Sequence, residues 1–161
     1  MPTLLPGNLA PDVTLHAIDG TTVRLSDTWR TGPAVLTFYR GDFCPVCNRY
    51  LHELQARHAD FAAAGATVIA ISSDRPELGI ETARRNELPF PVLADPDRQA
   101  IDAYGVIYNE AEGHAEPAVF IIDGDGRVAY EAIVSGPLGR PSVDAVIMIA
   151  QRVAQGTRAH S

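Results

Sequence analysis

The sequence has little cysteine, no cluster of basic residues and no long hydrophobic run. It contains 13 lysine and arginine residues against 20 aspartate and glutamate residues, for a formal net charge of −7. Nucleic acids and anionic membranes are bound through basic surfaces, so neither is expected as a partner. No apolar stretch reaches the roughly 18 residues of a membrane-spanning helix. A small molecule or a protein is the better candidate for the partner.

The N-terminus also lacks the features of a secretory signal. Residues Met1 to Gly7 contain no basic residue and no long apolar core. We therefore expect a cytoplasmic protein, although a periplasmic chain after removal of its signal would look the same. At 161 residues, the chain is long enough for one compact domain, residues 1–161, with one hydrophobic core.

The two cysteines, Cys44 and Cys47, form a Cys-x-x-Cys pair. They are too few for a disulfide scaffold or for a four-thiolate zinc site. In a reducing compartment such a pair indicates redox chemistry rather than a permanent cross-link. Two alternatives remain, namely two small buried hydrophobic residues and a metal half-site completed by His52 or another chain. The redox interpretation requires no cofactor and no metal.

Hydrophobic patterning predicts a three-layer α/β domain with a mixed central sheet. Alternation from Asp12 to Leu25 predicts an N-terminal β-hairpin, and continuous apolar runs at 33–39 and 67–72 predict buried strands. A second hairpin is predicted over 117–133, around Asp123-Gly124-Asp125-Gly126. Helices are predicted from the cysteines to about Gly65, over 76–87, as a turn at 96–104 and over 142–155, with a short extended piece at 90–93. Only residues 109–116 are expected to form a mobile loop.

This pattern places the cysteines at the junction between a buried strand and a helix. A thiol with an ordinary pKa of about 8.5 is mostly protonated at neutral pH, whereas the thiolate is the nucleophile. Pro45 suits the first helical position, and Cys47 falls within the first turn. The helix dipole and unpaired backbone N–H groups then favour an anion at both sulfurs. The spacing also allows the pair to cycle between dithiol and disulfide.

Two arginines flank the pair. Arg40 is a candidate for stabilising a thiolate, whereas Arg49 is equally well explained as a solvated residue of the helix surface. The five histidines show no ligand spacing with acidic residues, and we assign them no role.

A set of ordered motifs covers nearly the whole chain. They are Gly7-x-x-Ala10-Pro11-Asp12-Val13, the run from Phe38 to Cys47, Val68 to Asp74, Leu93 to Asp97 with Ala103 to Val106, and Phe120 to Asp123. On these motifs the chain resembles the AhpC/TSA peroxiredoxin-like group of the thioredoxin fold superfamily, as a Cys-x-x-Cys variant. The resemblance implies a thioredoxin fold with three α/β/α layers and a thiol-dependent peroxidase activity.

The family motif Pro-x-x-x-Thr-x-x-Cys implies that Cys47 is the cysteine that attacks the peroxide. In this chain Arg40 stands at the motif proline, Cys44 at the threonine, and Pro117 at the position of a distant arginine that binds the peroxide oxygens. The site therefore lacks the family's usual hydroxyl and guanidinium, both of which stabilise charge on oxygen. Arg40 is a candidate substitute for the guanidinium.

Two residues match thioredoxin-like reductases instead. These reductases have an aromatic residue before Cys-x-x-Cys, as Phe43 is here, and a proline with a cis peptide bond opposite the cysteines. Pro117 holds that position, so we expect the Glu116–Pro117 bond to be cis. The alternative is an ordinary proline at the start of a strand, where no N–H is needed.

Two mechanisms follow, with a third reading beside them. In the peroxidase, Cys47 reduces hydrogen peroxide or an organic hydroperoxide, becomes a sulfenic acid and is resolved by Cys44. In the disulfide reductase, Cys44 attacks a protein disulfide and Cys47 resolves the mixed disulfide. The third reading is a redox-inactive binding module. The peroxidase is preferred, with an external thioredoxin-type dithiol as reductant, and relatives of this type often form homodimers.

Overall fold

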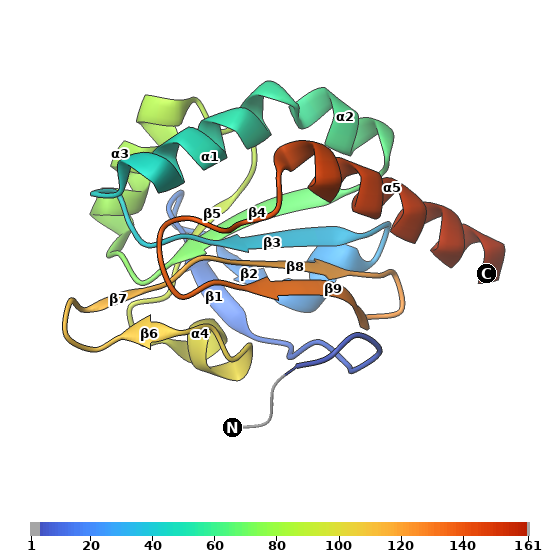
Figure 1. Cartoon of the computed structure of the whole chain (residues 1–161), viewed down its shortest axis with the longest axis horizontal. Helices are drawn as coiled ribbons and strands as arrows, with labels where there is room; N and C mark the ends of the chain where they lie inside the picture. The colour runs from blue at the N-terminus through green and yellow to red at the C-terminus, as the bar shows by residue number, and fades with distance from the viewer. Residues whose placement is uncertain (1–3, 161) are drawn as a thin grey trace.

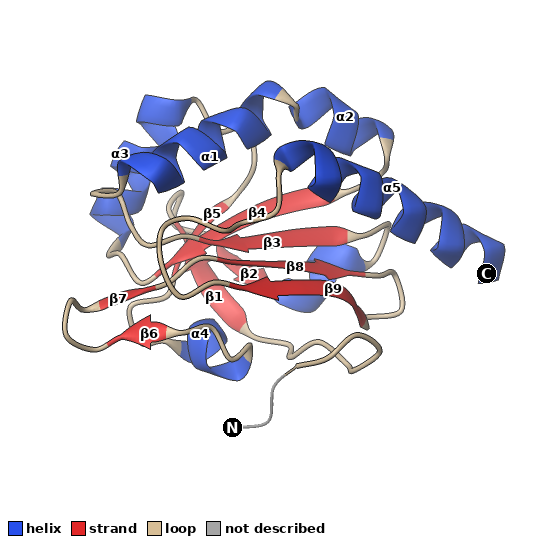
Figure 2. Cartoon of the chain, viewed as in Figure 1, coloured by secondary structure: helices blue, strands red, loops and turns tan. Residues whose placement is uncertain are grey.

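A seven-stranded mixed sheet forms the centre of the molecule (Figures 1 and 2), in the order β2-β1-β5-β4-β3-β8-β9. The computed structural model describes residues 4–160, and side chains up to residue 156. β3, β4 and β5 run parallel, whereas β1, β8 and β9 add antiparallel pairings. The strands are β1 (Thr14–Ala17), β2 (Thr22–Arg24), β3 (Ala34–Phe38), β4 (Thr67–Ser72), β5 (Val92–Ala94), β8 (Ala118–Ile122) and β9 (Val128–Ile133).

Helices cover both faces of this sheet, which confirms the predicted three-layer α/β/α arrangement of a thioredoxin fold. One face carries α1 (Pro45–Ala56), α2 (His58–Ala63), α3 (Pro76–Asn86) and α5 (Val143–His160), as Figure 2 shows. The thinner layer on the other side contains the 3-10 helix η1 (Leu25–Trp29) and α4 (Gln99–Ala103). No helix within residues 4–160 combines the length and the apolar character needed to cross a bilayer.

The central strand β3 is buried on both faces, as its uninterrupted apolar run predicts. Leu36 and Phe38 point into the core beneath η1 and α4, while Val35 points toward α1 and α5. Phe120 of β8 packs edge-on against Phe38 at 5.8 Å between ring centroids. Because β3 is held from both sides, its carboxyl end is a rigid base for the loop that follows.

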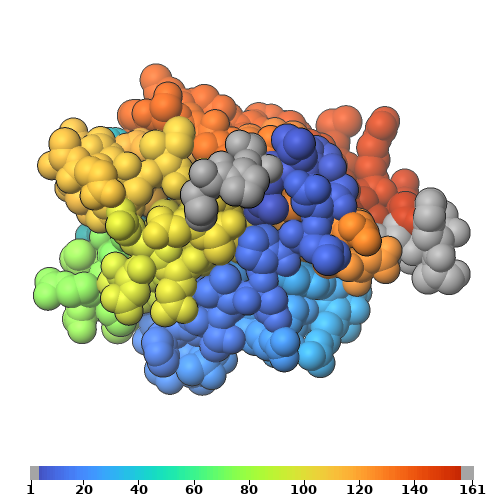
Figure 3. Space-filling model, turned by 90° about the horizontal axis from the view of Figure 1, so that it is seen from below, coloured from blue at the N-terminus to red at the C-terminus, as the bar shows by residue number. Residues whose placement is uncertain are grey.

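The N-terminal hairpin around Asp19-Gly20 is confirmed, with Leu15 opposite Val23. The second hairpin, formed by β8 and β9, is confirmed as well. The segment before β1 lies against the turn of this second hairpin. Gly7 N–H donates to Val128 O at 2.7 Å, and Ala10 N–H donates to Gly126 O at 2.8 Å. Figure 3 shows this N-terminal segment crossing the underside of the molecule beside the turn between β8 and β9.

Two local predictions are wrong. The helix expected from the cysteines to Gly65 is broken at Arg57, whose φ of −106° and ψ of 16° separate α1 from α2. The segment 109–116 belongs to a small hairpin instead of an open loop, made of β6 (Tyr108–Asn109) and β7 (His114–Ala115). This hairpin matters for the site, because its second strand carries His114, which contacts Arg40 and Phe43 in the loop before α1.

Candidate active site at the start of α1

Cys44 and Cys47 occupy the first turn of α1, directly after β3. Cys44 is the N-cap residue, with extended backbone angles, and Pro45 follows at the first helical position. Cys47 N–H donates to Cys44 Sγ at 3.3 Å, so the sulfur itself caps the helix. Both cysteines are free thiols, and the two residues are 1% and 0% exposed. The predicted placement at a helix start is therefore confirmed.

The two thiols differ in pKa, against the expectation that the helix start lowers both. Burial raises the pKa of Cys44, but hydrogen bonds from the Cys47 thiol and backbone N–H, together with Arg40, outweigh burial and bring it below the ordinary value. For Cys47 burial prevails and raises the pKa, although the positive charge of Arg140 opposes it. The surroundings of the pair therefore favour negative charge at Cys44 over negative charge at Cys47.

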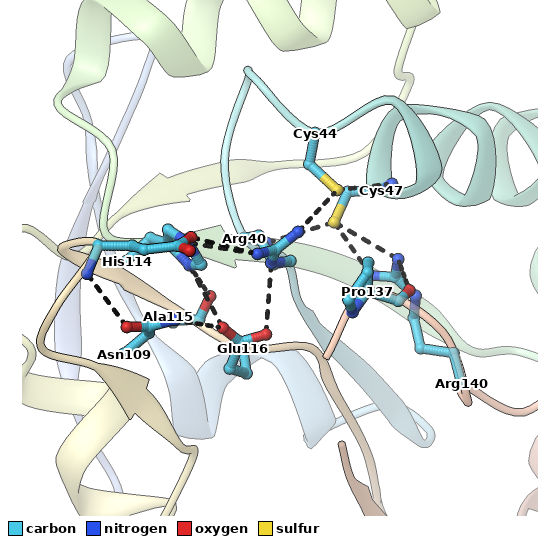
Figure 4. Close-up of polar contacts among 10 residues, drawn as sticks. Arg40, Cys44, Cys47, Asn109, His114, Ala115, Glu116, Pro137 and Arg140 are labelled. Atoms are coloured by element: carbon cyan, nitrogen blue, oxygen red, sulfur yellow. Dashed lines mark hydrogen bonds and ion pairs between the residues drawn. The ribbon is translucent and has the colours of Figure 1, made fainter. Parts of the chain in front are cut away.

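Two guanidinium groups lie on opposite sides of the sulfurs (Figure 4). Arg40 Nη1 is 3.9 Å from Cys44 Sγ, and the Arg40 backbone N–H donates to Cys47 Sγ at 3.4 Å. Arg140 Nη1 and Nη2 contact Cys47 Sγ at 3.5 and 3.4 Å. Arg49, the other candidate from the sequence, is exposed on α1. Each sulfur thus has its own arginine, and the one at Cys47 comes from the loop between β9 and α5.

Buried acidic and imidazole groups hold Arg40 in place (Figure 4). Its Nε lies 3.3 Å from a carboxylate oxygen of Glu116, and its Nη2 lies 3.4 Å from His114 Nε2. His114 Nε2 also contacts Glu112 Oε2 at 2.8 Å. Sequence reasoning assigned no role to His114, and it named Glu116 only as the residue before Pro117. Both lie in or beside β7, which places them under the active-site loop.

Phe43 projects from the same loop and is 57% exposed. Its ring centroid lies 4.9 Å from that of His114 and 5.5 Å from the Arg40 guanidinium carbon. The ring also covers Gly41, whose φ of +154° suits glycine and whose hypothetical Cβ would meet Phe43 at 2.9 Å. Asp74 anchors the loop by accepting the Asp42 N–H at 2.7 Å. The loop before Cys44 is therefore fixed from the side of β4 as well.

Pro117 opens β8 with a trans peptide bond, since residues 4–160 contain no cis bond. The expected cis bond is therefore wrong, and the main argument for a thioredoxin-like reductase is removed. The Pro117 carbonyl accepts the Val134 N–H at 3.0 Å, and the missing N–H is not needed at this strand start. Phe38 pairs with Ala118 in the sheet, so Pro117 lies at the edge from which the cysteine loop departs.

The described part of the chain contains no group of three or more histidine, cysteine, aspartate or glutamate residues placed to hold a metal ion. His52, which could have completed a metal half-site, is exposed on α1. The arrangement is instead suited to thiol chemistry, with a buried dithiol at a helix start and a guanidinium group near each sulfur.

Comparisons with known proteins agree with this chemistry. The AhpC/TSA family model matches residues 6–131. A putative peroxiredoxin of Mycobacterium tuberculosis is 33% identical over 131 residues, which cover 78% of this chain and 82% of that protein. Peroxiredoxin Bcp of Bacillus subtilis is 31% identical over 134 residues, covering 80% and 85%.

A relative named as a thiol-disulfide oxidoreductase and several solved structures are also similar to this chain. Thiol-disulfide oxidoreductase ResA of Geobacillus thermodenitrificans is 28% identical over 138 residues, covering 85% of this chain and 73% of its own. The crystal structure of AhpC from Enterococcus faecalis superposes with a TM-score of 0.84 at 25% identity, covering 98% of this chain and 96% of that one. Peroxidoxin BcpB of M. tuberculosis superposes with a TM-score of 0.78 at 25% identity, covering 98% and 99%.

Proposed function

Because the chain belongs to the AhpC/TSA family, we propose that it is a thiol-dependent peroxidase in which Cys47 attacks the peroxide and Cys44 resolves the product. The observation that carries the assignment of Cys47 is the convergence of three N–H donors on its sulfur, one from the Arg40 backbone and two from Arg140. Donors fixed in this way stabilise negative charge as it develops at the reacting atoms. Cys44 Sγ accepts the Cys47 backbone N–H at 3.3 Å, and its guanidinium contact, Arg40 Nη1 at 3.9 Å, is longer than those of Cys47.

This order of events requires a proton transfer within the pair, from Cys47 to Cys44, against the order of their two pKa values. The Cys44 thiolate accepts the proton of the Cys47 thiol, and the Cys47 sulfur attacks the terminal oxygen of the peroxide. The O–O bond breaks, the sulfur is oxidised to a sulfenic acid, and the leaving oxygen takes the proton and departs as water or an alcohol. Cys44, again a thiolate, attacks the Cys47 sulfur and expels hydroxide, which leaves a disulfide. An external dithiol then reduces the disulfide by exchange.

A disulfide reductase remains the second candidate, and one observation favours it. The lower pKa belongs to Cys44, and in thiol–disulfide exchange the more acidic thiol supplies the attacking thiolate. The similarity to the thiol-disulfide oxidoreductase ResA supports the same candidate.

Trapping of the sulfenic acid separates the two candidates. The reduced wild type, Cys44→Ser and Cys47→Ser are treated with hydrogen peroxide in the presence of a dimedone probe, and the labelled residue is identified by mass spectrometry. We expect label on Cys47 in Cys44→Ser and none on Cys44 in Cys47→Ser. Label on Cys44 alone would refute the assignment. Rapid reduction of a protein disulfide with no consumption of peroxide would favour the reductase.

The proposal also includes the location of the enzyme, its domain organisation, its reductant and its oligomeric state. We place the enzyme in the cytoplasm, as one domain over residues 1–161, with a thioredoxin-type protein as the dithiol reductant. The family match over residues 6–131 supports the single domain, because the sheet continues through β9 without a break. We also propose a homodimer, which light scattering of the purified protein tests directly.

A further inference from the structure

Tyr50 joins α1 to the loop between β9 and α5, on the side of the site where Cys47 lies. It follows Cys47 by one helical turn, and both side chains belong to the buried face of α1. The Tyr50 hydroxyl donates to Pro141 O at 2.8 Å, in a residue 91 positions away in the sequence. Burial raises the pKa of this hydroxyl, so it remains a donor well above neutral pH. The first turns of α1 and the loop that carries Arg140 are therefore tied together.

The Tyr50 ring also lies against the guanidinium group of Arg140. Arg140 Cζ is 4.8 Å from the ring centroid, a distance at which the face of an aromatic ring attracts a cation. The same guanidinium reaches Cys47 Sγ with both Nη atoms, as Figure 4 shows, and donates from Nη2 to Pro137 O at 3.2 Å. The place of this guanidinium beside the sulfur thus depends on the Tyr50 ring as well as on the loop.

The two arginines of the site are held by different kinds of partner. Arg40 lies beside the carboxylates of Glu112 and Glu116, which offset part of its positive charge. In the described part of the chain, no carboxylate lies within ion-pair distance of Arg140. An aromatic ring attracts a cation without neutralising it. The full charge of Arg140 therefore remains available to Cys47, whose raised pKa it opposes.

We propose that Tyr50 is a positioning residue for the reaction of Cys47, which holds the Arg140 guanidinium against the sulfur with its ring and holds the loop with its hydroxyl. This inference rests on the proposed peroxidase function and adds to it a residue that acts through Arg140. Negative charge is carried by the Cys47 sulfur before the attack and by the leaving oxygen after it. A guanidinium that is fixed in advance stabilises this charge without having to be ordered during the reaction.

Three tyrosine variants test this role. Tyr50→Phe removes the hydroxyl tie and keeps the ring, whereas Tyr50→Leu removes both. Tyr104→Phe is the matched control, because the Tyr104 hydroxyl also donates to a proline carbonyl, Pro11 O at 2.6 Å. Tyr104 lies in the core on the opposite face of the sheet from Tyr50. Urea unfolding and circular dichroism report the stability and the fold of each variant.

Two readouts are measured. The first is the stopped-flow rate of sulfenic acid formation with hydrogen peroxide at neutral pH. The second is the pH dependence of the alkylation of Cys47 by iodoacetamide in a Cys44→Ser background, followed by mass spectrometry. This second readout reports the pKa of the Cys47 thiol and needs no peroxide. A role in stability alone would leave it unchanged.

We expect Tyr50→Phe to form the sulfenic acid about threefold more slowly, which corresponds to one net hydrogen bond, and Tyr50→Leu about tenfold more slowly, because the cation–π contact is lost as well. Both changes should move the alkylation profile of Cys47 to higher pH, by up to about one unit for Tyr50→Leu. Tyr104→Phe should lose stability and keep both readouts. In an Arg140→Gln background, Tyr50→Leu should have no further effect on the rate.

An unchanged alkylation profile in Tyr50→Leu, or equal slowing by Tyr50→Leu with and without Arg140, would overturn the positioning role. Slowing by Tyr104→Phe as large as that by Tyr50→Phe would overturn it too, since the effect would then follow from destabilisation alone. If Tyr50→Leu does not fold, Tyr50→Phe carries the test. Absence of sulfenic acid in the wild type would refute the peroxidase, and the alkylation profile would still decide the role of Tyr50.

Discussion

Replacement of Arg140 by glutamine is the most direct perturbation of the proposed reaction centre. The substitution removes both Nη contacts to Cys47 Sγ and leaves the Arg40 backbone N–H as the remaining donor. It also removes the positive charge that opposes the raised pKa of Cys47, so that pKa should rise further. A hydrogen bond to a charged group contributes about 1.5–3 kcal/mol. Because one donor remains, we take about 2 kcal/mol, which corresponds to a roughly thirtyfold lower rate.

The assay is stopped-flow measurement of sulfenic acid formation with hydrogen peroxide at neutral pH. Arg140→Lys should recover part of the loss, because it keeps the charge without the two-pronged geometry. Arg152→Gln, which changes an exposed arginine on α5, serves as the control and should react like the wild type. A rate for Arg140→Gln within threefold of the wild type, in a protein with an unchanged circular dichroism spectrum, would refute the role of Arg140.

Two further expectations concern the loop that leads into α1. Arg40→Gln removes a group that lowers the pKa of Cys44, so the thiolate absorbance at 240 nm should appear at higher pH than in the wild type; an unchanged titration would show that Arg40 does not stabilise the thiolate. Gly41→Ala places a Cβ against Phe43 and Asp74 at an unfavourable φ of +154°, which should cost about 1–3 kcal/mol in urea unfolding. Gly136→Ala, with no atom within 4 Å of its Cβ, should be neutral, and equal effects of the two changes would contradict the crowding argument.

The sequence was sufficient for those features that depend on local periodicity. The apolar run of β3 and the proline after Cys44 predicted a buried strand followed by a helix start, and the cysteines lie there. The break at Arg57 escaped prediction, because the apolar pattern continues across it into Phe61. For Pro117 the resemblance led us to expect a cis peptide bond, although most X-Pro bonds are trans. The bond in the structure is trans.

The electrostatic partners of the sulfurs could not be found in the same way. Arg140 lies 93 residues from Cys47 in the chain, and no spacing links the two. His114 approaches Arg40 only because β6 and β7 pair into a hairpin, in a segment that is too polar to be distinguished from a loop. The difference in pKa between the two thiols follows from these contacts and from burial. At Cys47 burial raises the pKa by more than the helix start lowers it.

The cap of α1 has a consequence for turnover. The sulfur that caps the first turn of this helix, Cys44 Sγ, is also the atom that the proposed disulfide would use. A disulfide sulfur carries no negative charge, so in the proposed cycle oxidation would weaken the cap, and loss of a helix cap typically costs about 1 kcal/mol. We therefore expect the helix end to open more readily in the oxidised protein than in the reduced one, which would give the reductant access to a buried disulfide.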